Sequence, residues 1–163
     1  METTANPLLS PALLPDFPAL QPAHVVPAVE AVLADYRAAV ERLVADPSAR
    51  DFDTLVAPLE QLDEQLSRTW SPVSHLHGVK DSPELREVYA QADERITEFT
   101  TELGQHRGLY EAMQAVRDGA GFAALDRAQR TLVEDSLRGF RNSGVALEEP
   151  ARSRFREIQT ELS

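Results

Sequence analysis

The sequence contains no cysteine, a single lysine and no long apolar run. The absence of cysteine excludes disulfide bonds, thiolate zinc ligands and cysteine nucleophiles, and it is compatible with a reducing compartment. No segment approaches the ~20 apolar residues that are needed to span a bilayer. Residues 1–20 also lack the basic start and the unbroken apolar run of a signal peptide. These absences predict a cytoplasmic protein that does not associate with membranes.

Positive charge is scarce as well. The chain carries 16 Lys and Arg against 27 Asp and Glu, which gives a formal net charge of −11. Such a surface repels phosphate groups, so we predict no binding to nucleic acid. A length of 163 residues fits one domain that buries roughly two thirds of its unfolded surface.

The first 22 residues form a proline-rich segment that also carries leucines and a phenylalanine. Proline fixes φ and removes a backbone donor, so this segment cannot be a long helix. A disordered tail would contain fewer apolar residues. We therefore predict an extended N-terminal arm over residues 1–22 that packs on the surface of the body. Its prolines are Pro7, Pro11, Pro15, Pro18 and Pro22.

The rest of the chain repeats its apolar residues at steps of three and four, the period of an amphipathic helix. We predict an all-α fold, a multi-helix antiparallel bundle of about six helices over residues 23–163. The expected helices span about 23–46, 51–78, 82–104, a shorter segment that closes at 118–119, 123–142, and a last helix from about 149. That last helix has no stop signal, so we expect the chain to be truncated within it.

Capping residues and prolines refine these limits. Asp51 or Asp53 can cap the second helix, and Ser82 followed by Pro83 opens the third. Pro58 and Pro72 fall within the second helix and should each bend it locally, because each removes one i→i−4 hydrogen bond. Gly78 is expected to stop that helix.

The four histidines are the natural candidates for a metal or catalytic site. His75 and His77 lie two positions apart, with Asp81 nearby. On a helix such residues are about 200° apart and cannot chelate one ion, whereas a helical zinc pair needs i, i+4 spacing. We interpret these two histidines as residues of a helix end. His24 fits a helix start or a contact residue. His106, between two glycines, fits a solvated or turn-stabilising role better than binding of a peptide or carbonyl group.

Other signatures of chemistry are weak. Adjacent acids such as Asp63-Glu64 and Glu134-Asp135 diverge on a helix by roughly 100°, which is typical of a solvated face. The sequence contains no nucleophile elbow, no Walker loop and no G-x-G-x-x-G. The residues by themselves predict an all-α domain without catalytic, cofactor-binding or metal-binding residues of its own.

Five stretches carry a resemblance to a known family. They are NPLL at 6–9, HVVPAV at 24–29, SPVSHLHGVKDSPELREVY at 71–89, GQHRGLY at 104–110 and LRGFRNSGVAL at 137–147. In order and spacing the chain resembles the N-terminal region of the thimet-oligopeptidase family of zinc metallopeptidases, and in particular its oligopeptidase A group. The resemblance covers essentially the whole chain.

The resemblance implies a mostly helical protein with two halves around a deep channel that cleaves short peptides. Zinc in the full-length parent would be held by the two histidines of HExxH and a downstream glutamate, with the motif's own glutamate as general base. Those residues belong to the C-terminal half of the family's sequence, and no histidine here is followed by glutamate.

Two functions remain open. The chain would be the N-terminal helical region of a cytoplasmic zinc-dependent oligopeptidase, part of the substrate-channel wall and inert alone. It would then act on short peptides through the full-length enzyme, pack against the remainder of the same polypeptide, and self-associate when isolated. Alternatively, it is a stand-alone helical interaction module that binds a partner helix or peptide.

Overall fold

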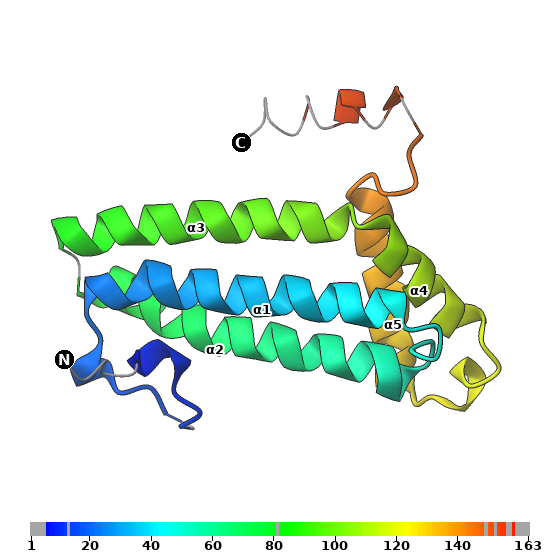
Figure 1. Cartoon of the computed structure of the whole chain (residues 1–163), viewed down its shortest axis with the longest axis horizontal. Coiled ribbons are helices and arrows are strands. Elements are labelled where there is room, and N and C mark those ends of the chain that lie inside the picture. The colour runs from blue at the N-terminus through cyan, green and yellow to red at the C-terminus, as the bar shows by residue number, and fades with distance from the viewer. Residues whose placement is uncertain are drawn as a thin grey trace. The chain divides into compact units, whose positions relative to one another are not determined.

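The computed structural model describes residues 6–12, 14–80, 82–148, 150–151, 153–155 and 158. These residues contain α-helices and shorter 3-10 and π turns, and no strand occurs among them, which confirms the predicted all-α fold. Most of the predicted last helix lies outside the described residues, although residues 151, 153–155 and 158 are helical. The helices are α1 (Val25–Ala45), α2 (Ala57–Val79), α3 (Pro83–Gly104), α4 (Arg107–Asp118) and α5 (Arg127–Asn142) (Figure 1).

The described residues divide into two compact units. The first unit consists of those up to Ala39 together with Leu59–Phe99, and the second consists of Val40–Pro58 together with those from Thr100 onward. The three long helices each contribute residues to both units. The division of the chain into an arm over 1–22 and one helical domain over 23–163 stays a prediction.

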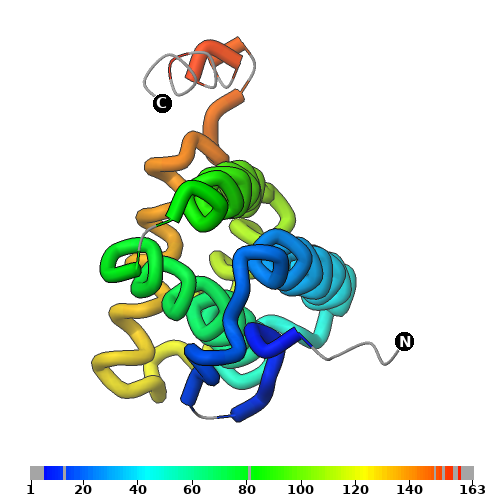
Figure 2. Tube along the Cα trace, turned by 90° about the vertical axis from the view of Figure 1, so that its left-hand side faces the viewer, coloured from blue at the N-terminus to red at the C-terminus, as the bar shows by residue number. Residues whose placement is uncertain are grey.

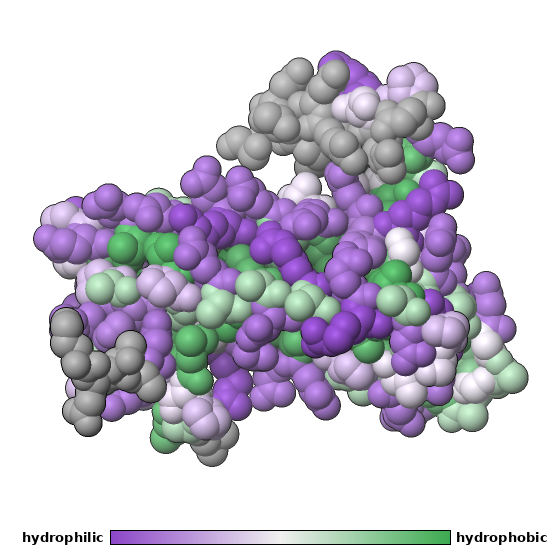
Figure 3. Space-filling view, in the orientation of Figure 1, coloured by the Kyte–Doolittle hydropathy of each residue, from purple (hydrophilic) through white to green (hydrophobic). Residues whose placement is uncertain are grey.

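The first unit is built on α1, α2 and α3, which run antiparallel to their neighbours in sequence (Figure 1) and are seen nearly end-on in Figure 2. Apolar residues of α1, spaced at the predicted steps of three and four, form the core of this unit. The ring of Tyr36 lies against that of Phe99 from α3, with 4.9 Å between the ring centroids. On the face seen in Figure 3, hydrophilic side chains line most of α3. The buried residues of α1 in this unit are Val25, Ala28, Val29, Val32, Leu33 and Tyr36.

The start of α2 differs from a regular helix. Asp51 is the N-cap and accepts a 2.8 Å hydrogen bond from the Thr54 N–H, as one of the two predicted alternatives had it. The turn that follows, η4 (Phe52–Val56), is a π-helix, and α2 begins only at Ala57. Pro58 therefore stands at the second position of α2, directly after the π turn. The bends expected at Pro58 and Pro72 stay predictions.

The end of α2 lies one residue beyond the predicted stop at Gly78, since the helix includes Val79. The start of α3 is as predicted, because the Ser82 hydroxyl accepts a 3.2 Å hydrogen bond from the Leu85 N–H. Pro72 is buried inside α2.

The described part of the arm contains no α-helix but is not uniformly extended. It forms three 3-10 turns, η1 (Pro7–Leu9), η2 (Phe17–Ala19) and η3 (Pro22–His24), each with a proline in its first two positions. Proline suits these positions because the first N–H groups of a helical turn have no internal partner. Ser10 and Leu20, which follow two of these turns, are extended.

In the second unit, α4 packs against α5 and η4. The predicted end of α5 at Asn142 is confirmed, but its predicted start at 123 is wrong. Residues Phe122–Ala124 form the 3-10 turn η5, and α5 begins after Asp126. Asp126 and Gln129 exchange side-chain-to-backbone hydrogen bonds of 2.8 and 3.0 Å. This capping box fixes the helix start more strongly than the apolar pattern does.

Candidate functional site: a groove between the arm and α2

Within the first unit, polar side chains of α2 attach the arm. The Thr69 hydroxyl, 2% exposed, lies 3.0 Å from the Gln65 carbonyl and 3.4 Å from that of Leu8 in the arm. The guanidinium of Arg68 donates from Nη2 to the carbonyls of Pro11 (3.2 Å) and Ala12 (2.6 Å). Because proline interrupts regular structure here, these carbonyls have no helical partner, and the α2 side chains supply one.

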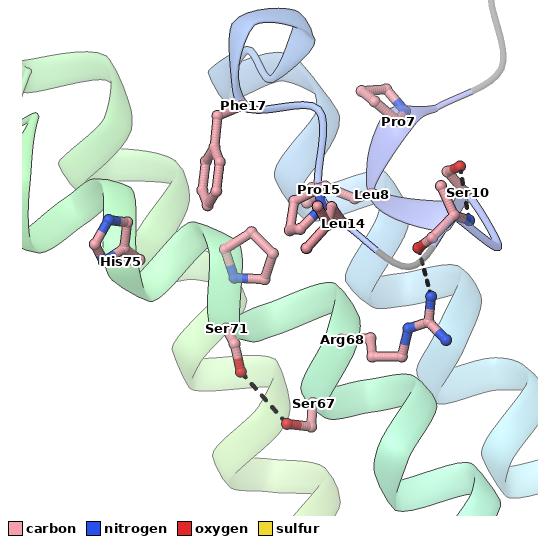
Figure 4. Close-up of a pocket in the computed structure, with 12 residues that line it drawn as sticks. Pro7, Leu8, Ser10, Leu14, Pro15, Phe17, Ser67, Arg68, Ser71 and His75 are labelled. Carbon is pink, nitrogen blue, oxygen red and sulfur yellow. Dashed lines mark hydrogen bonds between the residues drawn. The ribbon is translucent and has the colours of Figure 1, made fainter.

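Between the arm and α2 lies a groove of about 400 Å³ (Figure 4). Phe17 stands at one end of it, tilted against the ring of His75 with 5.7 Å between centroids. Arg68 stands toward the other end, with its hydrogen bond to the arm drawn in Figure 4. The groove is lined by Pro7, Leu8, Ser10, Ala12, Leu14, Pro15, Phe17, Ser67, Arg68, Ser71, Pro72 and His75.

None of the described residues that line this groove is an acid, although the chain as a whole has 27 Asp and Glu. Its polar groups are the Arg68 guanidinium, the His75 imidazole and a few hydroxyls, of which those of Ser67 and Ser71 lie 3.3 Å apart. An apolar groove with a small number of polar groups is the common form of a small-ligand site. We therefore take it as the candidate functional site.

The structure separates the two histidines of the predicted helix end. His75 lies on the groove, whereas His77 stacks on Tyr89 of α3, with 4.0 Å between centroids. Tyr89 also stacks on Trp70, with 4.7 Å between centroids. The opposite orientations follow from the i, i+2 spacing on α2. Asp81 lies outside the described residues, and among those that are described no group of three or more His, Asp or Glu could hold a metal ion.

His24 and His106 each accept a hydrogen bond from a backbone N–H through Nδ1. His24 accepts a 3.2 Å hydrogen bond from the Gln21 N–H. His106 is the N-cap of α4 and accepts a 3.0 Å hydrogen bond from the Leu109 N–H. Since Nδ1 of His106 is an acceptor, Nε2 carries the hydrogen that points to Oε1 of Glu41, 3.1 Å away. The turn-stabilising interpretation of His106 is confirmed.

Sequence reasoning missed the carboxyl groups beside Tyr36. The buried Tyr36 hydroxyl donates a 2.9 Å hydrogen bond to Oδ1 of Asp63. Desolvation raises the pKa of Asp63 more than this hydrogen bond lowers it, and desolvation also raises the pKa of Glu60, with a further contribution from Asp63. The i, i+3 spacing of Glu60 and Asp63 was the available signal, but nothing in the sequence placed Tyr36 opposite them.

Arg68 and Arg50 were also missed. Arg50 donates from its two terminal nitrogens to the carbonyls of Leu43, Val44, Asp46 and Ala49, and so closes the end of α1 within the second unit. The partners of both arginines are backbone carbonyls, which every residue carries, so no sequence pattern identifies them. The partner Ala12 is also 56 residues from Arg68.

Comparison with known proteins decides the family. Residues 29–152 match the model of the neurolysin/thimet oligopeptidase N-terminal domain. The chain belongs to this family. It is 48% identical over 158 residues to oligopeptidase A of Salmonella typhimurium and 47% identical to that of Escherichia coli, in both cases over 97% of this chain and 23% of the relative. It is also 35% identical to a probable cytosolic oligopeptidase A of Arabidopsis thaliana. The chain thus spans about a quarter of the length of these curated relatives.

The stretches that resemble this oligopeptidase family contact one another in the first unit. Asn6 of NPLL donates from Nδ2 to the carbonyl of His24 of HVVPAV, at 2.8 Å. His75 of SPVSHLHGVKDSPELREVY also contacts the arm, through Phe17, which lies outside these stretches. In this unit, residues of the stretches that carry the resemblance therefore hold the arm in place.

In the second unit, two further stretches of the resemblance are explained by close packing. A Cβ on Gly108 of GQHRGLY would lie 2.7 Å from Cγ1 of Val44, and one on Gly104 would lie 2.7 Å from Oγ of Ser143. Gly144 of LRGFRNSGVAL has a φ of +78°, a conformation that L side chains rarely adopt. These glycines are determined by the fold.

Proposed function

We propose that this chain is the N-terminal helical region of a cytoplasmic zinc-dependent oligopeptidase. In the complete enzyme it forms part of the wall of the substrate channel, and alone it is inert. The observation that carries the proposal is the match of nearly the whole chain, at 47–48% identity, to 23% of two bacterial proteins named oligopeptidase A. The arm and glycine contacts of this chain lie in the stretches that carry the resemblance, and they support the same placement because they concern architecture rather than chemistry.

The residues of this chain do not fit the zinc site that the family implies. HExxH does not occur in the sequence, because none of its four histidines is followed by glutamate. In the described structure, Nδ1 of His24 and of His106 is engaged with the backbone, while His75 and His77 face different neighbours. Zinc would therefore be held by residues of the complete enzyme that correspond to no part of this chain.

The role in the complete enzyme is steric. A layer of packed helices excludes folded proteins and admits flexible chains, so substrate size is selected before any bond is cleaved. Short peptides and the remainder of the polypeptide are then the partners of this region. Exposed apolar side chains on the arm, among them Leu14 at 77%, make self-association of the isolated chain part of the proposal.

A chimera tests the proposal. The matching 158 residues of the Escherichia coli relative are replaced by those of this chain, and cleavage of a quenched short peptide is measured with and without a chelator. We expect chelator-sensitive cleavage by the chimera, no cleavage of a folded protein substrate, and no cleavage of either by this chain alone. A chimera with its zinc bound but no activity would contradict the proposal, and so would chelator-sensitive cleavage by the isolated chain.

A further inference from the structure

The groove between the arm and α2 carries one unused recognition group. Arginine has five N–H donors, and both hydrogen bonds of Arg68 to the arm start from Nη2. The Nε and Nη1 donors of Arg68 have no partner within the part of the chain that the structure describes. Glu64, one turn earlier on α2, lines with Arg68 a neighbouring pocket but forms no ion pair with it.

A planar guanidinium with free donors is suited to a carboxylate, which it can bind through two parallel hydrogen bonds. The described residues of the groove wall include no acid that would compete for Arg68, whereas the chain has a net charge of −11. A carboxylate ligand therefore finds at Arg68 a local positive site on a protein that repels anions elsewhere.

The length of the groove sets the size of the ligand. Arg68 and His75 are seven residues apart on α2, which corresponds to about 10 Å along a helix at 1.5 Å per residue. An extended peptide advances about 3.3 Å per residue, so about three residues fill this span. Pro7, Leu8, Leu14, Pro15, Phe17 and Pro72 form an apolar wall along it.

We propose that this groove binds the C-terminal three residues of an apolar peptide, with the terminal carboxylate on the Arg68 guanidinium and the apolar side chains against the arm. The inference rests on the proposed function, since peptides are the ligands of the complete enzyme. It adds a peptide-binding site on the N-terminal region, formed by the arm and α2 alone.

Calorimetry on this chain tests the proposal with two peptides, acetyl-Leu-Pro-Leu with a free carboxylate and its C-terminal amide. Because Arg68 is exposed, we expect the acid to bind about fivefold more tightly than the amide. In R68Q this preference should disappear, so that acid and amide bind equally. The ratio of the dissociation constants of the two peptides isolates the charge interaction from any general change in the groove.

Two variants on the arm provide a matched pair that leaves Arg68 intact. Leu14 is 77% exposed and lines the groove, whereas Leu9 is 45% exposed and lines the neighbouring pocket instead. Both side chains point largely into water, so glutamate at either position should leave folding intact. We expect L14E to weaken binding of the acid peptide by at least about fivefold and L9E to change it by less than about twofold.

Several results would overturn the proposal: no binding of either peptide, equal binding of acid and amide by the unsubstituted chain, or equal effects of L14E and L9E on binding. Octanoate binding as tightly as the acid peptide would assign the groove to apolar carboxylates in general and refute the peptide claim. An active chimera without peptide binding by the chain refutes only this inference, and binding with an inactive chimera refutes only the proposed function.

Discussion

The hydroxyl of Tyr36 on α1 donates a 2.9 Å hydrogen bond to the carboxyl group of Asp63 on α2. Burial raises the pKa of Tyr36, and the nearby charge of Asp63 raises it further. Desolvation likewise raises the pKa of Asp63 above its usual value. The folded chain therefore binds the Asp63 proton more tightly than the unfolded chain does.

This relationship predicts a pH-dependent effect of D63N. A carboxyl group with a raised folded-state pKa stabilises most below its unfolded pKa, and that contribution is lost as the pH rises through the folded pKa. Asparagine cannot ionise but still accepts the Tyr36 hydrogen bond. We expect D63N to melt at a higher temperature than the parent at neutral pH, with the difference shrinking below about pH 4. A D63N protein that is less stable at neutral pH would show that the hydrogen bond to the charged carboxylate outweighs desolvation.

His106 gives a second prediction, on helix capping. Because its Nδ1 accepts the Leu109 N–H at the start of α4, H106A should lower the free energy of unfolding by about 1 kcal/mol, and H106N should recover most of the loss. Urea denaturation measures both. E41Q is the control for the other ring nitrogen and should cost less than about 0.5 kcal/mol, since that pair is exposed. A larger effect of E41Q than of H106A would contradict the capping role.

Two glycines near the end of α5 provide a matched test of backbone conformation. Gly144 has a φ of +78° and lies close to Phe155, so G144A should destabilise by at least about 1 kcal/mol. Gly139 is an exposed helical residue with nothing within 4 Å of an added Cβ, and G139A should stabilise by about 0.5–1 kcal/mol. Both are measured by urea denaturation. Equal effects of the same sign would contradict the assignment of Gly144.

Zinc provides the fourth prediction. Metal that binds only the folded state raises the melting temperature by mass action. His75 and His77 face different neighbours, so we expect added zinc to leave the melting temperature of this chain unchanged, and H77A to behave alike. A stoichiometric, zinc-dependent rise in the parent that is absent from H77A would reveal a site at these histidines.

Local patterns in the sequence predicted most of the helices. Apolar residues between Val25 and Tyr36 are buried at the helical period. Asp51 and Ser82 cap the helical segments that follow them. Where two local signals competed, the apolar pattern failed, because the capping box at Asp126 moved the start of α5 beyond the predicted residue 123. Such signals act within one or two turns of a helix, and the residues concerned can be identified from the sequence.

The sequence by itself determined the all-α class, the absence of HExxH and the separation of His75 from His77, because each depends on composition or on the fixed geometry of a helix. Only the tertiary structure decided that Arg68 and Thr69 hold the arm, that a groove with no acid among its described lining residues lies between the arm and α2, and that Asp63 contacts Tyr36. The partners in these contacts are tens of residues apart, and several are backbone carbonyls. Their positions follow from chain packing, which no local pattern encodes.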